Sequence, residues 1–237
     1  MPSETISFSQ RAHLSEWMDE PCSYAEFRAC LRDLVKVNRA VFGYRPTLNW
    51  LEPFASSVIA PLHIVDVGSG AGDMLRRIES WARRRKVTVR LTGIDRNPFA
   101  AQAAREFGKA NSRVEWVTCD AFAYQPPAKI DLVISSLFTH HLSDAEIVHF
   151  LQWMEHIAVR GWFVNDLERA RVPYYAFKAL ASGMRWHRFV RHDGPVSIRR
   201  GFIQDDWRRY ISKACLPANA VNILGAWPAR LCVARVK

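Results

Sequence analysis

Three glycines lie between two aspartates in the segment Asp66-Val-Gly-Ser-Gly-Ala-Gly-Asp73. The apolar run before it is typical of a strand buried on both faces, and the residues after it recur at helical spacing. A strand that turns through glycines into a helix presents free backbone N–H groups to a ligand. Counted from Gly68, the sixth position is Asp73, whereas a dinucleotide-binding loop has glycine there. The two carboxylates would repel a pyrophosphate, so they favour a cationic or polyhydroxyl ligand.

Aspartates also end the next two predicted strands, at Asp95 and Asp120. In an open parallel sheet, ligands lie at the carboxyl ends of the strands. Asp95 is then placed to accept hydrogen bonds from ribose hydroxyls. Asp120 can accept a hydrogen bond from the exocyclic amine of adenine, with Ala121 and Phe122 as apolar walls. S-adenosylmethionine has adenine, ribose and a cationic amino-acid end, and it satisfies all these groups.

These segments resemble the motifs of class I S-adenosylmethionine-dependent methyltransferases over roughly residues 60–166. The resemblance implies an enzyme of the EC 2.1.1 class that uses S-adenosylmethionine, releases S-adenosylhomocysteine and needs no metal. Gly93-Ile-Asp95 is similar to the family's ribose-binding segment, and Ile130–Ser135 to its fourth-strand motif. The implied cofactor-binding residues are Asp66, Gly68, Ser69, Gly70, Gly72, Asp95, Arg96, Asp120, Ala121 and Ser135.

Three histidines are candidates for catalysis. His140 and His141 follow the fourth predicted strand, and they resemble the His-His segment of many small-molecule methyltransferases of this class. An unperturbed imidazole has a pKa near 6.5, which suits the removal of a proton from a phenolic acceptor. For one of the pair, a purely structural imidazole is the more probable role. His192 is a secondary candidate, because Asp193-Gly-Pro195 favours a turn.

Strands alternating with helices must position these residues. We predict strands at 62–67, 87–94, 114–119, 130–135 and 162–166. We predict helices at 24–43, 47–58, 73–85 and 98–107, with another beginning at Ser143, and Pro53 could interrupt the second of them. Two late apolar runs, 221–224 and 231–236, predict an antiparallel hairpin. The fold class is therefore α/β. With the resemblance, it becomes a Rossmann-like, seven-stranded, mostly parallel sheet with helices on both faces.

The chain divides into an N-terminal helical segment, 1–60, and a methyltransferase domain, 61–237. The N-terminal helices could cover the ligand or merely flank the sheet. Residues 167–210 form an aromatic, basic insertion, which we expect to be a lid over the acceptor. Around the fifth strand's end, Asn165, Asp166 and Glu168 could orient the substrate. Arg169 and Arg171 could bind an acidic group or face solvent.

Composition limits the remaining choices. The 237 residues suffice for one substantial core, and the formal net charge is +10. That charge fits a nucleic acid, an anionic membrane surface or an acidic substrate, but a solvated basic surface explains it equally well. The five scattered cysteines and the lack of a signal-like N-terminus predict a reduced, cytoplasmic protein without a transmembrane segment.

We therefore expect methyl transfer to a small, aromatic or polyketide-like acceptor of secondary metabolism, most plausibly at oxygen. An anionic or carrier-bound acceptor is compatible with the basic charge. Two alternatives are an RNA methyltransferase, for which the charge and the basic run Arg83–Lys86 argue, and a non-catalytic cofactor-binding module. The segment after the fourth strand lacks the Asp/Asn-Pro-Pro-aromatic motif of amino-group nucleic-acid methyltransferases, so nucleic acid is the weaker choice. The oligomeric state is left open.

Overall fold

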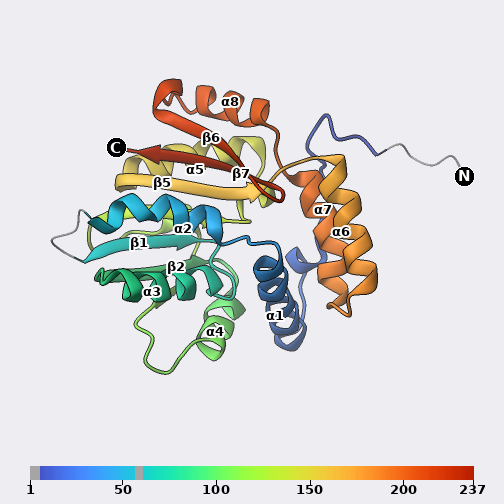
Figure 1. Ribbon diagram of the computed structural model, residues 1–237, viewed down its shortest axis with the longest axis horizontal. Helices are drawn as coiled ribbons and strands as arrows, with labels where there is room; N and C mark the ends of the chain where they lie inside the picture. The colour runs from blue at the N-terminus through green and yellow to red at the C-terminus, as the bar shows by residue number, and fades with distance from the viewer. Residues whose placement is uncertain (1–5, 57–60) are drawn as a thin grey trace, which may run out of the picture.

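A seven-stranded sheet forms the centre of the computed structural model, which describes residues 6–56 and 61–237 (Figure 1). The strand order is β3-β2-β1-β4-β5-β7-β6. Strands β1 to β5 pair in parallel, whereas β7 runs antiparallel to both β5 and β6, so the expected fold class is confirmed. The strands are β1 Leu62–Val67, β2 Val89–Asp95, β3 Glu115–Thr118, β4 Ile130–Ser136, β5 Ala158–Leu167, β6 Val221–Ala226 and β7 Arg230–Val236.

Helices cover both faces of the sheet. One core packs α2 and α3 against it, and the other packs α5 and α8. Helices α1, α6 and α7 instead lie together beyond the carboxyl ends of the parallel strands (Figure 1). The bounds are α1 Tyr24–Ala40, α2 Arg45–Leu51, α3 Asp73–Arg85, α4 Pro98–Phe107, α5 Asp144–Ile157, α6 Arg171–Gly183, α7 Arg188–Arg200 and α8 Gln204–Lys213.

Local sequence signals set most helix starts. Asn97 caps α4 by accepting a hydrogen bond from the N–H of Phe99, and Ser143 and Glu146 form a capping box on α5, as predicted. The helix predicted at 47–58 is interrupted near Pro53, as the alternative expected. Helix α2 ends at Leu51, a 3-10 turn follows over Glu52–Ser56, and the remainder of the prediction lies outside the described residues.

The turn predicted at Asp193-Gly-Pro195 is wrong, because these residues lie inside α7. The buried face of α7, with Phe189, Val190 and Ile198, packs against α1 and α6. Burial of that face outweighs the local preference for a turn. Within the described residues, no helix is long and apolar enough to cross a membrane. All five cysteines are free thiols.

Candidate active site

The carboxyl ends of β1 and β4 are neighbours at the point where the strand order reverses. Ligands of open α/β sheets bind in the crevice that opens at such a point. A cavity lies there, which we call the glycine-loop cavity. Its sheet side is lined by Asp66, Gly68, Ser69, Gly70, Ser136 and Leu137, and its α1 side by Leu31, Leu34, Val35 and Asn38. The N-terminal helical segment therefore covers the loop instead of only flanking the sheet.

Two glycines of the loop are required by both conformation and space. Gly68 and Gly72 have φ angles of 71° and 70°. A Cβ on Gly68 would lie 2.6 Å from the ring of Phe138, and one on Gly72 would lie 2.1 Å from the ring of Trp116. Any larger residue at either position would strain the backbone and displace an aromatic side chain.

Asp66 is the polar group that best defines the ligand of this cavity. Its carboxyl group is buried, and its Oδ1 has no hydrogen-bond partner among the described residues. Burial raises the pKa of Asp66 well above its usual range, and the negative charges of Asp73 and Asp95 raise it further. An unpaired buried carboxyl group is costly unless a ligand supplies a donor. The residues present therefore fit the cationic amino-acid end of S-adenosylmethionine.

Asp95 lies at the end of β2, beside the glycine loop. Its two carboxylate oxygens accept hydrogen bonds from the backbone N–H groups of Gly70, at 2.8 Å, and Asn97, at 2.9 Å. Burial raises the pKa of Asp95, although these two hydrogen bonds oppose the rise. Asp95 therefore ties the loop to β2, and each oxygen keeps a lone pair that a ribose hydroxyl can use.

The other residues predicted to bind the cofactor lie at or just after the ends of β2, β3 and β4. Asp120 follows β3 and accepts a hydrogen bond from the N–H of Phe122 at 2.8 Å, while Ala121 is buried next to it. Arg96 is exposed. The hydroxyl of Ser135 donates to the carbonyl of Val67 at 3.0 Å, so it joins β4 to β1. Its neighbour Ser136, which the sequence analysis did not select, lines the glycine-loop cavity instead.

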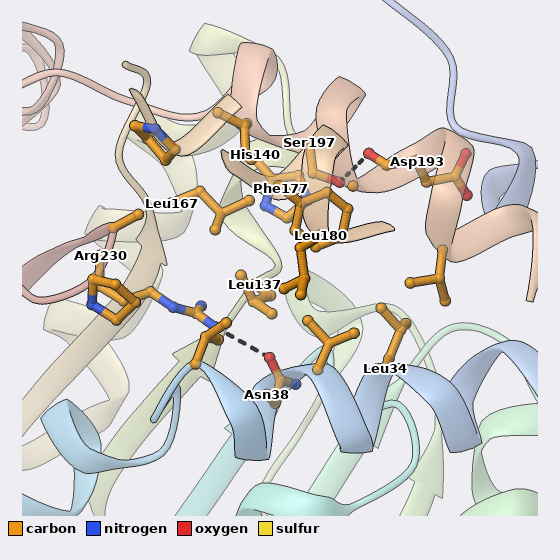
Figure 2. A pocket seen from close by; sticks show the side chains of 18 of the residues that line it. Leu34, Asn38, Leu137, His140, Leu167, Phe177, Leu180, Asp193, Ser197 and Arg230 are labelled. Carbon is orange, nitrogen blue, oxygen red and sulfur yellow. Dashed lines mark hydrogen bonds between the residues drawn. The ribbon is translucent and has the colours of Figure 1, made fainter. Parts of the chain in front are cut away.

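A larger cavity of about 400 Å³, which we call the apolar cavity, adjoins the first one. Its walls come from α1, α6, α7 and the hairpin between β6 and β7 (Figure 2). Leu34, Asn38 and Leu137 line both cavities, together with Met18, so a ligand in one lies next to a ligand in the other. The predicted lid insertion thus supplies much of the wall, through residues such as Val172, Ala176, Phe177, Leu180 and Val190.

His140 enters the apolar cavity as half of a buried histidine–carboxylate pair. Its Nδ1 lies 2.7 Å from Oδ1 of Asp166, and Oδ2 of Asp166 accepts hydrogen bonds from the Thr139 hydroxyl and the His140 backbone N–H. Burial alone would raise the pKa of Asp166, but the charge and hydrogen bond of His140 hold it below its usual range. A carboxylate only accepts, so Nδ1 donates the hydrogen bond, and in the neutral form of the ring the lone pair lies on Nε2.

Glu16 approaches the other side of both histidines. Its carboxylate lies 3.6 Å from Nε2 of His140 and 3.9 Å from Nε2 of His141, and Asp19 accepts a hydrogen bond from His141. Burial lowers the pKa of His141, but Asp19 and Glu16 outweigh it and leave that pKa raised. Glu16, His140 and His141 could hold a metal ion, because their ligand atoms lie within 4.8 Å of one another. Arg200, 3.5 Å from Glu16, already supplies a positive charge there.

Two sequence interpretations need correction. His192 stacks on Trp17 with ring centroids 3.8 Å apart and is bonded to Asp193, and it does not contribute to the lining of the apolar cavity. Arg169 neither faces solvent nor awaits an acidic ligand, because it is buried in an ion pair with Asp206 at 2.8 Å. Glu16, Asn38 and Arg230 were not predicted as site residues, because no motif marks them and only the tertiary fold brings them to the cavities.

Comparisons with known proteins agree with this arrangement. Residues 64–161 match the family model described as a methyltransferase domain. The ubiquinone biosynthesis O-methyltransferase of Leptothrix cholodnii is 25% identical over 210 residues, which cover 84% of this chain and 80% of that protein.

Two solved structures show the same fold. The plantazolicin methyltransferase BpumL, in complex with a triazolic desmethylPZN analogue and SAH, is 12% identical, with a TM-score of 0.62 over 90% of this chain and 97% of that one. Human N-acetylserotonin methyltransferase in complex with SAM is 16% identical, with a TM-score of 0.62 over 91% of this chain and 56% of that one.

Proposed function

We propose that the chain transfers a methyl group from S-adenosylmethionine to an oxygen of a small, aromatic or polyketide-like acceptor, and the match of residues 64–161 to a methyltransferase domain supports this. The observation that carries this proposal is the shared wall of the two cavities. One contains the unpaired carboxyl group of Asp66, and the other contains the buried pair of His140 and Asp166. An amino-acid end and an acceptor bound in these two places meet at Leu34, Asn38 and Leu137.

Residues at the ends of the first three strands would hold the cofactor. Asp66 would pair with its ammonium group, Asp95 with the ribose, and Asp120 with adenine. S-adenosylmethionine, when bound, supplies an electrophilic methyl group on a sulfonium. The glycine loop and α1 position that group and exclude water from it, which is the main task of an enzyme in an in-line displacement.

The apolar cavity aligns the acceptor, and His140 in its wall removes the acceptor's proton. A phenolic hydroxyl loses a proton as it is methylated. Nε2 of the neutral His140 ring has a lone pair that can accept this proton. Asp166 fixes the tautomer through Nδ1, and Glu16, 3.6 Å from Nε2, stabilises the imidazolium that forms. A buried histidine with carboxylates on both sides favours oxygen as the methyl acceptor, as does the similarity to an O-methyltransferase.

The test is methyl transfer by the parent and by His140→Asn. The parent should convert members of a panel of hydroxylated aromatic acceptors to methylated products, detected by mass spectrometry with S-adenosylhomocysteine as coproduct. His140→Asn should lower kcat by about 10²- to 10⁴-fold, because general-base catalysis supplies a factor of that size. Its affinity for S-adenosylhomocysteine should match the parent's, since His140 does not line the glycine-loop cavity. Equal kcat for the two proteins would contradict the role given to His140.

An assay with a chelator distinguishes general-base catalysis by His140 from catalysis that depends on a bound metal ion. Because Arg200 already neutralises part of the carboxylate charge around His140, we expect the parent treated with EDTA to keep its activity. Loss of activity with EDTA and recovery with a divalent ion would instead assign Glu16, His140 and His141 to a metal.

A further inference from the structure

The apolar cavity contains a buried cation that the proposed chemistry does not use. Arg230 is the first residue of β7 and is only 3% exposed. Its side chain reaches across the cavity toward Asn38 on α1 (Figure 2). Nη2 donates a hydrogen bond to the side-chain oxygen of Asn38 at 3.1 Å, whereas Nη1 has no partner among the described residues.

The other buried arginines are neutralised by carboxylates. Arg169 pairs with Asp206 at 2.8 Å, and Arg200 pairs with Asp19 at 3.2 Å. Within residues 6–56 and 61–237, Arg230 forms no such ion pair. Burial lowers the pKa of Arg230, but the charge of Asp166 opposes this, and a guanidinium stays protonated near neutral pH. A buried charge without a directly paired counterion is unfavourable, so a ligand that supplies one is favoured.

The surrounding backbone makes room for this guanidinium. A Cβ on Gly43 would lie 2.6 Å from Nη2 of Arg230, so glycine at this position permits the close approach. The neighbouring walls are apolar, with Leu137, Leu167, Val41 and Pro228 among them. In such surroundings a charge-assisted, bidentate interaction between a guanidinium and a carboxylate is strong and selective.

We infer that Arg230 binds a carboxylate of the methyl acceptor, so the substrates are apolar molecules that carry both a hydroxyl group and a carboxylate. The inference rests on the proposed function, because it names the acceptor class of the same cavity. S-adenosylmethionine has a carboxylate too. Arg230 lines the apolar cavity and not the glycine-loop cavity, which favours the acceptor as its partner.

The test uses two probes of the same ring system and similar size, the anionic 2-naphthoate and the neutral 2-naphthamide, titrated calorimetrically into the protein saturated with S-adenosylhomocysteine. The parent should bind 2-naphthoate about 10- to 100-fold more tightly, as expected for buried hydrogen bonds to a charged group. Arg230→Gln should reduce that ratio to about one while keeping the parent's affinity for S-adenosylhomocysteine. Arg235→Gln is the matched control, since Arg235 lies on the same strand outside the cavity lining, and it should keep the ratio.

Thermal unfolding gives a second readout. Replacing a structural arginine would lower the Tm, whereas Arg230→Met removes an unneutralised buried charge and should leave the Tm equal or higher. The inference is overturned if the parent does not prefer 2-naphthoate, if it binds neither probe, or if Arg230→Gln keeps the preference. It is also overturned if that variant loses affinity for S-adenosylhomocysteine but keeps the preference, since the cofactor would then supply the carboxylate. Failure of the parent to bind S-adenosylhomocysteine would instead contradict the proposed function.

Discussion

Asp66 has a buried carboxyl group whose Oδ1 lacks a partner in the described part of the chain, with Asp73 and Asp95 close enough to raise its pKa. In the unfolded chain this carboxyl group has a pKa near 3.8. In the ligand-free fold it therefore keeps its proton at pH values at which the unfolded chain has lost it. Stability then falls as the pH rises from that unfolded value to the raised folded value. A bound ammonium group would favour the ionised carboxylate of Asp66 over its protonated form.

The raised pKa of Asp66 leads to a prediction for the variant Asp66→Asn. The parent's affinity for S-adenosylhomocysteine should increase with pH as Asp66 ionises, measured by calorimetry between about pH 5 and 8. The variant should bind about 10- to 100-fold more weakly at the upper end and lose this pH dependence, because its amide has no charge to offer. Ligand-free Asp66→Asn should be at least as thermally stable as the parent at neutral pH. A variant that binds as tightly as the parent would contradict the assignment of Asp66.

At the scale of elements, the N-terminal strap, Arg11–Asp19, brings Glu16 to the histidines. Helix α7 holds the strap in place, because the carboxylate of Asp193 accepts hydrogen bonds from the backbone N–H groups of Trp17, at 2.9 Å, and Met18, at 3.0 Å. This use of Asp193 explains why a residue typical of turns lies inside a helix. It makes α7 a positioning element for the site.

We expect Asp193→Ala to loosen the strap and lower kcat, because Glu16 would no longer be held beside His140. The fall in kcat should be larger than the change in affinity for S-adenosylhomocysteine, and limited proteolysis should cut the strap faster. Asp205→Asn is a suitable control, since that exposed carboxylate pairs with Arg208 within α8, away from the strap. Parent-like kcat and protease resistance in Asp193→Ala would show that the strap does not depend on this anchor.

The elements that the sequence predicted well carry strong local signals. The glycine loop, the capping box at Ser143 and the apolar strands that alternate with helices are each encoded by consecutive residues. The sheet and the glycine-loop cavity can therefore be predicted from them. The predicted turn in α7 failed because its local signal is opposed by tertiary packing. The positions of Glu16 and Arg230 in the site could not be predicted from the sequence, because these too depend on tertiary packing. They lie far apart along the chain, and their neighbours carry no motif that points to either one.

At the scale of the whole molecule, the basic run that could suggest an RNA partner lies away from the cavities. The basic run Arg83–Arg85 lies at the end of α3, and a thirteen-residue helix that starts at the glycine loop places it roughly 20 Å away. There it complements the helix dipole, and Arg85 also pairs with Glu52 at 2.9 Å. This placement explains the run without RNA, and it leaves Arg230 as the positive charge most directly tied to the acceptor.

The central claim is that two ligands meet where the glycine-loop cavity and the apolar cavity share a wall. A crystal structure with bound S-adenosylhomocysteine tests it most directly. The account predicts the amine nitrogen within about 3 Å of Oδ1 of Asp66. It also predicts that the sulfur faces Leu137 and the cavity that contains His140 and Arg230. An amino-acid end bound away from Asp66, or a sulfur turned away from the apolar cavity, would contradict the account.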